Sequence, residues 1–62
     1  MSVTTSQLDI LKALAAKSRV VYGGAQDDDT KALVRAGYVK ETAVNLSEVL
    51  YEITDVGRKK IN

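Results

Sequence analysis

The feature that most constrains this chain is the absence of any covalent or metal staple, because none of its 62 residues is cysteine or histidine. A domain of this size is near the lower limit at which one apolar core suffices, and many small folds rely on disulfides or structural metals. Without cysteine no disulfide can form, and without histidine the commonest metal ligand is missing. The fold must therefore be held by packed Leu, Ile, Val, Ala and Tyr side chains, with self-association as a further source of stability.

The composition is that of an ordered domain. Hydrophobic residues make up 45% of the chain and charged residues 27%, with both signs mixed along it. Disordered segments are usually poorer in apolar residues and carry a larger net charge. No proline, repeat or low-complexity linker interrupts the sequence. We therefore expect residues 1–62 to form a single domain.

Charge and hydropathy bear on where the protein works and what it binds. No apolar run is long enough to cross a bilayer, and no basic segment followed by an apolar stretch opens the chain. We therefore expect a cytoplasmic protein with no membrane partner. The formal net charge is +1, whereas strong nucleic-acid binders usually carry a clear basic excess. This balance argues mildly against nucleic-acid binding, although the positions of the cations matter more than their total.

Two local patterns organise the first half of the chain. Thr4 and Gln7 have the spacing of a capping box, with Ser6 as an alternative cap, and apolar residues then recur three and four positions apart. This pattern predicts a first helix. The β-branched and aromatic run Arg19–Tyr22 ends at a pair of glycines and predicts a short strand and a tight turn. The alternative is a first helix that continues to the glycines.

Three consecutive aspartates, Asp27–Asp29, open the second predicted helix. Carboxylates at this position cap free amide groups and suit the positive end of the helix dipole. The body of the helix, residues 30–36, ends at Gly37, which fits the left-handed position after a helix. Tyr38 then packs back on Leu33, as in a Schellman ending.

The second half of the chain predicts a hairpin followed by a short helix. Residues 38–42 and 49–53 suit two strands, and Ala43–Glu48 forms a loop longer than a two-residue turn. Thr54 is placed to cap a last helix over Asp55–Ile61. The predicted fold is thus α+β, in the order helix, short strand, helix, hairpin, helix. The hairpin and the short strand form a small antiparallel sheet against which the helices pack.

Two segments resemble the winged-helix domains of MarR-like and PadR-like regulators. Leu33–Val39 resembles the "L-x-x-x-G-hydrophobic-V/I" segment that joins the recognition helix to the wing, and Tyr51–Arg58 resembles the "Y-x-L-T-x-x-G" signature after the wing. The resemblance covers roughly the second half of the chain. It implies a DNA-binding protein of transcription-regulator type. The first half looks like a reduced variant, as in small bacterial or phage proteins, because residues 17–30 leave no room for the extra helix of a complete helix-turn-helix.

No group of residues predicts catalysis. The chain has no Cys or His for a nucleophile–base pair, and its serines have no obvious activating partner. Asp27–Asp29 lacks the spacing of an EF-hand loop, so a solvated helix cap is the better interpretation. The glycine pair is not followed by the Gly-Lys-Ser/Thr of a phosphate-binding loop. We therefore expect no catalytic residues, no metal, no cofactor and no small-molecule substrate.

The leading hypothesis is binding of double-stranded DNA through the second helix and the wing. Cations on such a surface neutralise phosphates, and an arginine can read guanine edges. The predicted contact residues are Lys31, Arg35, Lys40, Thr30, Lys17 and Arg19. The alternative is that these are ordinary solubilising charges. Asp27–Asp29 argues against DNA, because recognition helices usually point their N-terminal end at bases and these carboxylates would repel phosphates.

The competing hypothesis is a protein-interaction module without DNA binding, such as a phage or plasmid accessory factor. The predicted wing is unusually apolar because it carries Val44, Leu46, Val49 and Leu50. Packing of this wing within the monomer is the first expectation, and a homodimer or another protein partner is the second. The three tyrosines fit either a core or an interface.

Overall fold

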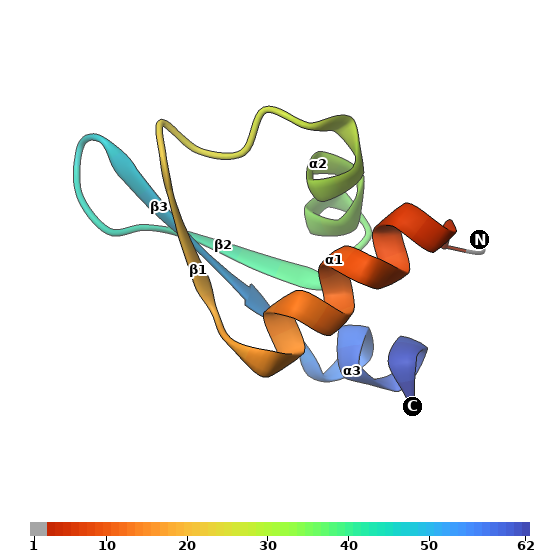
Figure 1. Ribbon diagram of the computed structural model, residues 1–62. Helices are drawn as coiled ribbons and strands as arrows, with labels where there is room; N and C mark the ends of the chain where they lie inside the picture. The colour runs from red at the N-terminus through yellow and green to blue at the C-terminus, as the bar shows by residue number, and fades with distance from the viewer. Residues whose placement is uncertain (1–2) are drawn as a thin grey trace.

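The computed structural model describes residues 3–62 and has an α+β architecture (Figure 1). Its elements are α1 (Thr5–Ala16), β1 (Arg19–Tyr22), α2 (Asp28–Arg35), β2 (Val39–Ala43), β3 (Glu48–Ile53) and α3 (Asp55–Ile61). The predicted order of helix, short strand, helix, hairpin and helix is confirmed, and the predicted ends are shifted by one or two residues at most. In particular, Arg19–Tyr22 is a strand and not a continuation of the first helix.

The strands form one antiparallel sheet in the order β1-β3-β2, so β3 lies at the centre and the other two strands form the edges. Tyr51 pairs with Arg19 on one side and with Glu41 on the other. Successive side chains of a strand point to opposite faces of the sheet. The register therefore assigns every strand residue to one of two faces, a covered face that contains Tyr51 and an open face that contains Leu50.

The core lies on the covered face, where the helices pack (Figure 1). Its buried members come from α1, α2, β2 and β3, and they are Leu11, Leu14, Leu33, Val39 and Tyr51. Partly buried residues of the remaining elements pack against them, including Val21 of β1 and Ile61 of α3. Full burial of one such side chain stabilises the fold by about 1.5–3 kcal/mol. A few apolar side chains therefore stabilise the fold, as expected for a chain without cysteine or histidine.

Both long helices begin at the predicted caps. The Thr4 hydroxyl accepts a hydrogen bond from the backbone N–H of Gln7 at 3.1 Å, and the Gln7 side chain accepts one from the Thr4 amide in return. The Asp27 carboxylate caps α2 by accepting from the Thr30 amide at 2.8 Å. The Gln7 side-chain amide also donates to Asp29 at 3.3 Å, and this contact joins the starts of α1 and α2.

The turn from α2 into β2 is the predicted Schellman ending. Gly37 has φ = 86°, in the left-handed region that glycine tolerates best. Its amide donates to the carbonyl of Val34, and the Tyr38 amide donates to the carbonyl of Leu33 at 3.0 Å. The Thr54 hydroxyl donates to the Gly37 carbonyl at 2.8 Å and also accepts from the Gly57 amide, so one side chain caps α3 and ties it to this turn.

Gly57 shows why the second motif ends in glycine. A Cβ atom at this position would collide with the backbone carbonyl of Tyr38 and come within 2.9 Å of the Ile53 side chain. The Gly57 residue is itself buried. The glycine therefore allows α3 to lie directly against the α2–β2 turn.

Tyr51 ties the β1–α2 connection to the sheet from within the core. Its ring is 3% exposed, and its hydroxyl accepts a hydrogen bond from the Ala25 amide at 2.9 Å. The same hydroxyl donates to the Glu41 carboxylate at 2.7 Å. Burial raises the pKa of the Tyr51 phenol above its ordinary value, and the neighbouring Glu41 carboxylate adds to this effect. Tyr51 is therefore a neutral donor at physiological pH and fixes the loop after β1.

The hairpin ends in a short, internally bonded turn. The Asn45 side-chain carbonyl accepts from the amides of Ser47 and Glu48 at 2.8 and 2.9 Å, and its amide group donates to the Glu48 carboxylate at 2.9 Å. The Val44 amide donates to the Glu48 carbonyl and closes the ladder. The turn is thus ordered by its own polar groups.

Candidate functional site

The cations predicted to bind DNA do not form one surface. Lys31 and Arg35 are both exposed and lie one turn apart on α2, as predicted. Lys40 is also exposed, but Val39 before it is buried in the core, so the Lys40 side chain points to the open face of the sheet. Its cross-strand partner on β3 is Glu52, which carries the opposite charge. Lys40 is therefore separated from the α2 cations by the sheet itself.

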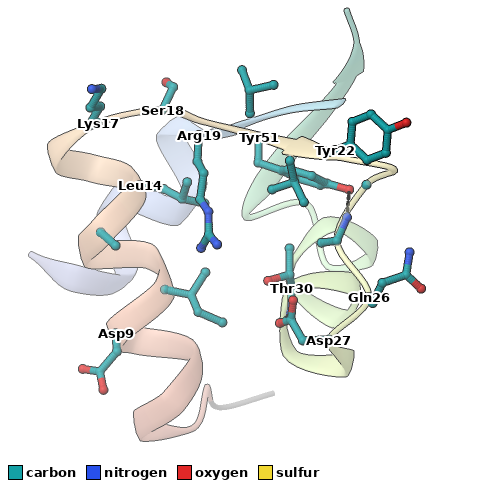
Figure 2. A pocket seen from close by; sticks show the side chains of 16 residues that line it. Asp9, Leu14, Lys17, Ser18, Arg19, Tyr22, Gln26, Asp27, Thr30 and Tyr51 are labelled. Atoms are coloured by element: carbon teal, nitrogen blue, oxygen red, sulfur yellow. Dashed lines mark hydrogen bonds between the residues drawn. The ribbon is translucent and has the colours of Figure 1, made fainter. Parts of the chain in front are cut away.

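The other three predicted residues line a groove between α1, β1 and α2. Lys17 and Arg19 are exposed on its wall, whereas Thr30 is 8% exposed and faces inward from α2. The groove has a volume of about 890 Å³. In Figure 2 the Arg19 guanidinium projects into the space between α1 and α2, toward Thr30 and Asp27. The structure thus brings together Lys17, Arg19 and Thr30, and places Lys31 and Arg35 on another surface.

The lining of this groove combines an apolar floor with a mixed rim. The apolar part includes Ile10, Leu14, Val21 and Tyr51. The charged side chains around it are Asp9, Lys17, Arg19 and Asp27, two of each sign. A rim of balanced charge does not select a strongly anionic ligand such as a nucleic-acid backbone. The apolar floor instead suits contact with apolar side chains.

The aspartates at the start of α2 have structural partners, yet they keep this end of the helix acidic. Hydrogen bonding by Thr30 holds the pKa of Asp27 below its ordinary value, with a smaller contribution from the charge of Arg19. Asp29 accepts a hydrogen bond from Gln7, and Asp28 is exposed. The carboxylates therefore remain at the end of α2 that would have to approach a DNA base.

A different surface gathers the exposed apolar side chains. Val20 is 48% exposed, Tyr22 82% and Val44 55%, and alternation assigns all three to the open face. Val20 pairs with the half-buried Leu50 of β3, which continues the apolar surface to the central strand. Leu46, at the tip of the hairpin, is 106% exposed. We call Val20, Tyr22, Val44, Leu46 and Leu50 the apolar patch.

The first expectation for the wing, packing within the monomer, is wrong for Val44 and Leu46. Both side chains project away from the core, because Val44 lies on the open face and Leu46 lies beyond the ladder. Val49 does pack against the core, since it lies on the covered face between Val21 and Ala43. The hairpin is therefore divided between the two faces of the sheet.

Sequence reasoning missed the contribution of β1 to this patch. Val20 was read only as a strand-forming residue, and Tyr22 was left open between a core and an interface position. A signal was present: residues 20 and 22 share one face of a strand, and the intervening Val21 is the natural core residue. Which of the two faces the helices cover could be known only from the tertiary structure.

Among residues 3–62, no three His, Cys, Asp or Glu side chains gather in a way that could hold a metal ion. Within the same range, no helix is both long and apolar enough to cross a membrane. The chain matches no protein-family model, no curated protein and no solved structure.

Proposed function

We propose that this domain is a protein-interaction module that docks a partner protein on the apolar patch. The observation that carries the proposal is the exposure of several apolar side chains on the open face and at the hairpin tip. Single exposed apolar residues are ordinary on protein surfaces, but contiguous ones mark interaction sites. Tyr22, with its exposed ring, belongs to a residue type that is enriched at such contacts.

The order of the hairpin tip supports the proposal. Because Asn45 bonds the turn internally, Leu46 is presented on a fixed backbone. Docking of a partner on Leu46 therefore costs little conformational entropy, because the loop is already ordered. The acidic Glu48 between Tyr22 and Val44 gives the patch a polar element, and polar groups among apolar ones orient a docked surface.

Site-specific photo-crosslinking tests this proposal. A photoreactive phenylalanine analogue at position 46 should form an adduct with one protein in the producing cell, and the same analogue at position 31 should not. The adduct protein, purified, should bind wild type and Lys31→Ala/Arg35→Ala alike. The adduct protein should bind Val44→Glu/Leu46→Glu at least about tenfold more weakly than wild type. Burying two carboxylates at the contact makes binding less favourable by more than about 1.4 kcal/mol. Equal binding by both double variants would overturn the proposal.

DNA binding through α2 is the second candidate. It is favoured by the exposure of Lys31 and Arg35 one turn apart, and by the resemblance of the α2–β2 segment to the corresponding part of winged-helix regulators. A titration with duplex DNA at low and raised salt decides it. Salt-sensitive binding that is lost in Lys31→Ala/Arg35→Ala and kept in Val44→Glu/Leu46→Glu would establish DNA as the ligand and displace the first proposal.

A further inference from the structure

Among the described residues, 3–62, no strand pairs with the outer edge of β1. Gly23 donates its amide to the carbonyl of Ser47, so the Gly23 backbone is directed toward β3. In an antiparallel ladder, hydrogen-bonded and non-hydrogen-bonded pairs alternate. Arg19 and Val21 therefore direct their backbone groups toward β3, whereas Val20 and Tyr22 direct theirs away from the sheet. An edge of this kind is a template for another strand.

The same two residues bear exposed apolar side chains, Val20 at 48% and Tyr22 at 82% exposure. Natural edge strands are commonly protected by a short length, by proline, by a bulge, or by charged side chains that include inward-pointing ones. The β1 strand has no proline, and its pairing with β3 runs without a bulge from Arg19 to Tyr22. Its one charged residue, Arg19, lies on the covered face at the start of the strand, so the segment from Val20 to Tyr22 carries no charge.

The groove lies on the covered side of this edge. Its lining includes the whole of β1, together with the chain on either side of it. Val21 contributes to the groove from the covered face, and Leu14 and Tyr51 form part of its floor. A strand added beside β1 would extend the covered face across the mouth of the groove. One extended segment could therefore pair with the edge through its backbone and cover the groove with an apolar side chain that points inward.

We propose that two copies of this chain pair through their β1 edges, antiparallel and related by a two-fold axis at Val21. In this register Val20 of each copy lies opposite Tyr22 of the other, and each such pair uses the unpaired backbone groups of both residues. The two pairs place a β-branched side chain beside an aromatic ring on the open face, a combination that stabilises antiparallel sheets. On the covered face, Val21 meets its own counterpart at the mouth of the groove, and Arg19 lies opposite glycine.

Several features select a second copy over an unrelated strand. The contact is self-complementary, as a two-fold interface must be, because the residues at either side of Val21 complement each other. No like charges oppose one another, since Arg19 faces Gly23 of the other copy. The product is a six-stranded sheet in which the two apolar patches become continuous. The inference does not rest on the proposed function, because it follows from the backbone of the edge.

Analytical ultracentrifugation over a range of concentrations tests the dimer. Wild type should show a concentration-dependent dimer, and Val20→Lys should raise its dissociation constant at least about tenfold, because two charges would be brought onto the shared edge. Thr42→Lys is the matched control, because Thr42 is an exposed open-face residue of the opposite edge strand and pairs with the same Leu50. It should leave the dissociation constant unchanged, and circular dichroism should show both variants folded.

A single cysteine tests the register. The chain has no cysteine, so Val21→Cys introduces its only thiol. In a non-hydrogen-bonded antiparallel pair the Cα atoms are about 4.5 Å apart, within the range that a disulfide spans. Val21→Cys should therefore oxidise to a covalent dimer faster than Thr42→Cys. A monomer at every concentration, a dimer that survives Val20→Lys, or crosslinking of Val21→Cys no faster than that of Thr42→Cys would each overturn the proposal.

Discussion

The two faces of the sheet are built from alternate residues of the same three strands, and they differ sharply in what they contact. On the covered face, Val39 and Tyr51 are 2% and 3% exposed and pack among the helices. On the open face, Tyr22 is 82% exposed although it is adjacent in sequence to the packed Val21. Half of each strand therefore holds this small domain together, and the other half is available for contact with another molecule.

The largest effect should come from the covered face. Leu33→Ala removes a side chain that is 1% exposed and should lower the free energy of unfolding by about 2–5 kcal/mol, through lost burial and the cavity left behind. Leu46→Ala makes the same chemical change at a fully exposed site and should alter it by less than about 0.5 kcal/mol. Urea denaturation followed by circular dichroism measures both. Similar losses in the two variants would mean that the faces are wrongly assigned.

The next effect tests the turn that lays α2 on the covered face. Gly37→Val should destabilise the domain by about 1–3 kcal/mol, because a β-branched residue is strained at φ = 86°. The control is Ala36→Val, one residue earlier, where φ is −77° and the backbone is right-handed helical. Thermal melts should separate the two variants clearly. If Gly37→Val and Ala36→Val have the same melting temperature, the left-handed turn is not what directs the chain from α2 into β2.

A smaller effect is expected at the start of α2. Asp27→Ala should cost about 0.5–2 kcal/mol by removing the cap, whereas Asp27→Asn should retain most of the stability at neutral pH. The pKa of Asp27 is lowered in the folded state, so its contribution is present above the ordinary value of 3.8 and is lost as the pH falls below it. Unfolding measured between pH 6 and pH 2 should therefore show a shallower acid slope in Asp27→Asn than in wild type. An unchanged slope would contradict the assigned role of Asp27.

The smallest effect on stability should come from the open face. Tyr22→Thr keeps a strand-forming residue and should change the free energy of unfolding by less than about 0.5 kcal/mol, because the ring has few contacts to lose. The same change should weaken docking on the apolar patch. A loss of stability comparable to that of Leu33→Ala would show that Tyr22 serves the fold and would remove it from the patch.

The local features of the fold were readable from the sequence. Thr4, Gly37 and Thr54 were each predicted at a helix boundary, and each occupies that boundary. Such signals act over a few residues, because a cap or a left-handed turn needs only its immediate neighbours. The element order followed from them, since each boundary limits what lies between.

The surfaces were not readable in the same way, because they depend on contacts between distant segments. Periodicity places Val20 and Tyr22 on one face of a strand, but only the packing of the helices decides that this face stays open. Lys17, Arg19 and Thr30 meet at a groove because β1 pairs with β3, which no local pattern encodes. The apolar hairpin was correctly noticed, yet its exposure depended on whether Val44 or Ala43 faced the core, and this is a matter of register.

The central position of β3 also governs the order in which the molecule can assemble. The strand made first, β1, finds its partner only when Tyr51 and its neighbours have been synthesised, because β1 pairs with β3 alone. Until then α1 and β1 have no sheet to join, so their apolar residues lack the strand against which they pack. The β2–β3 hairpin and the α2–β2 turn, by contrast, close over short stretches of chain and can form early. Folding should therefore begin in the second half of the chain and recruit the first half last, so the most recently synthesised residues organise those made first.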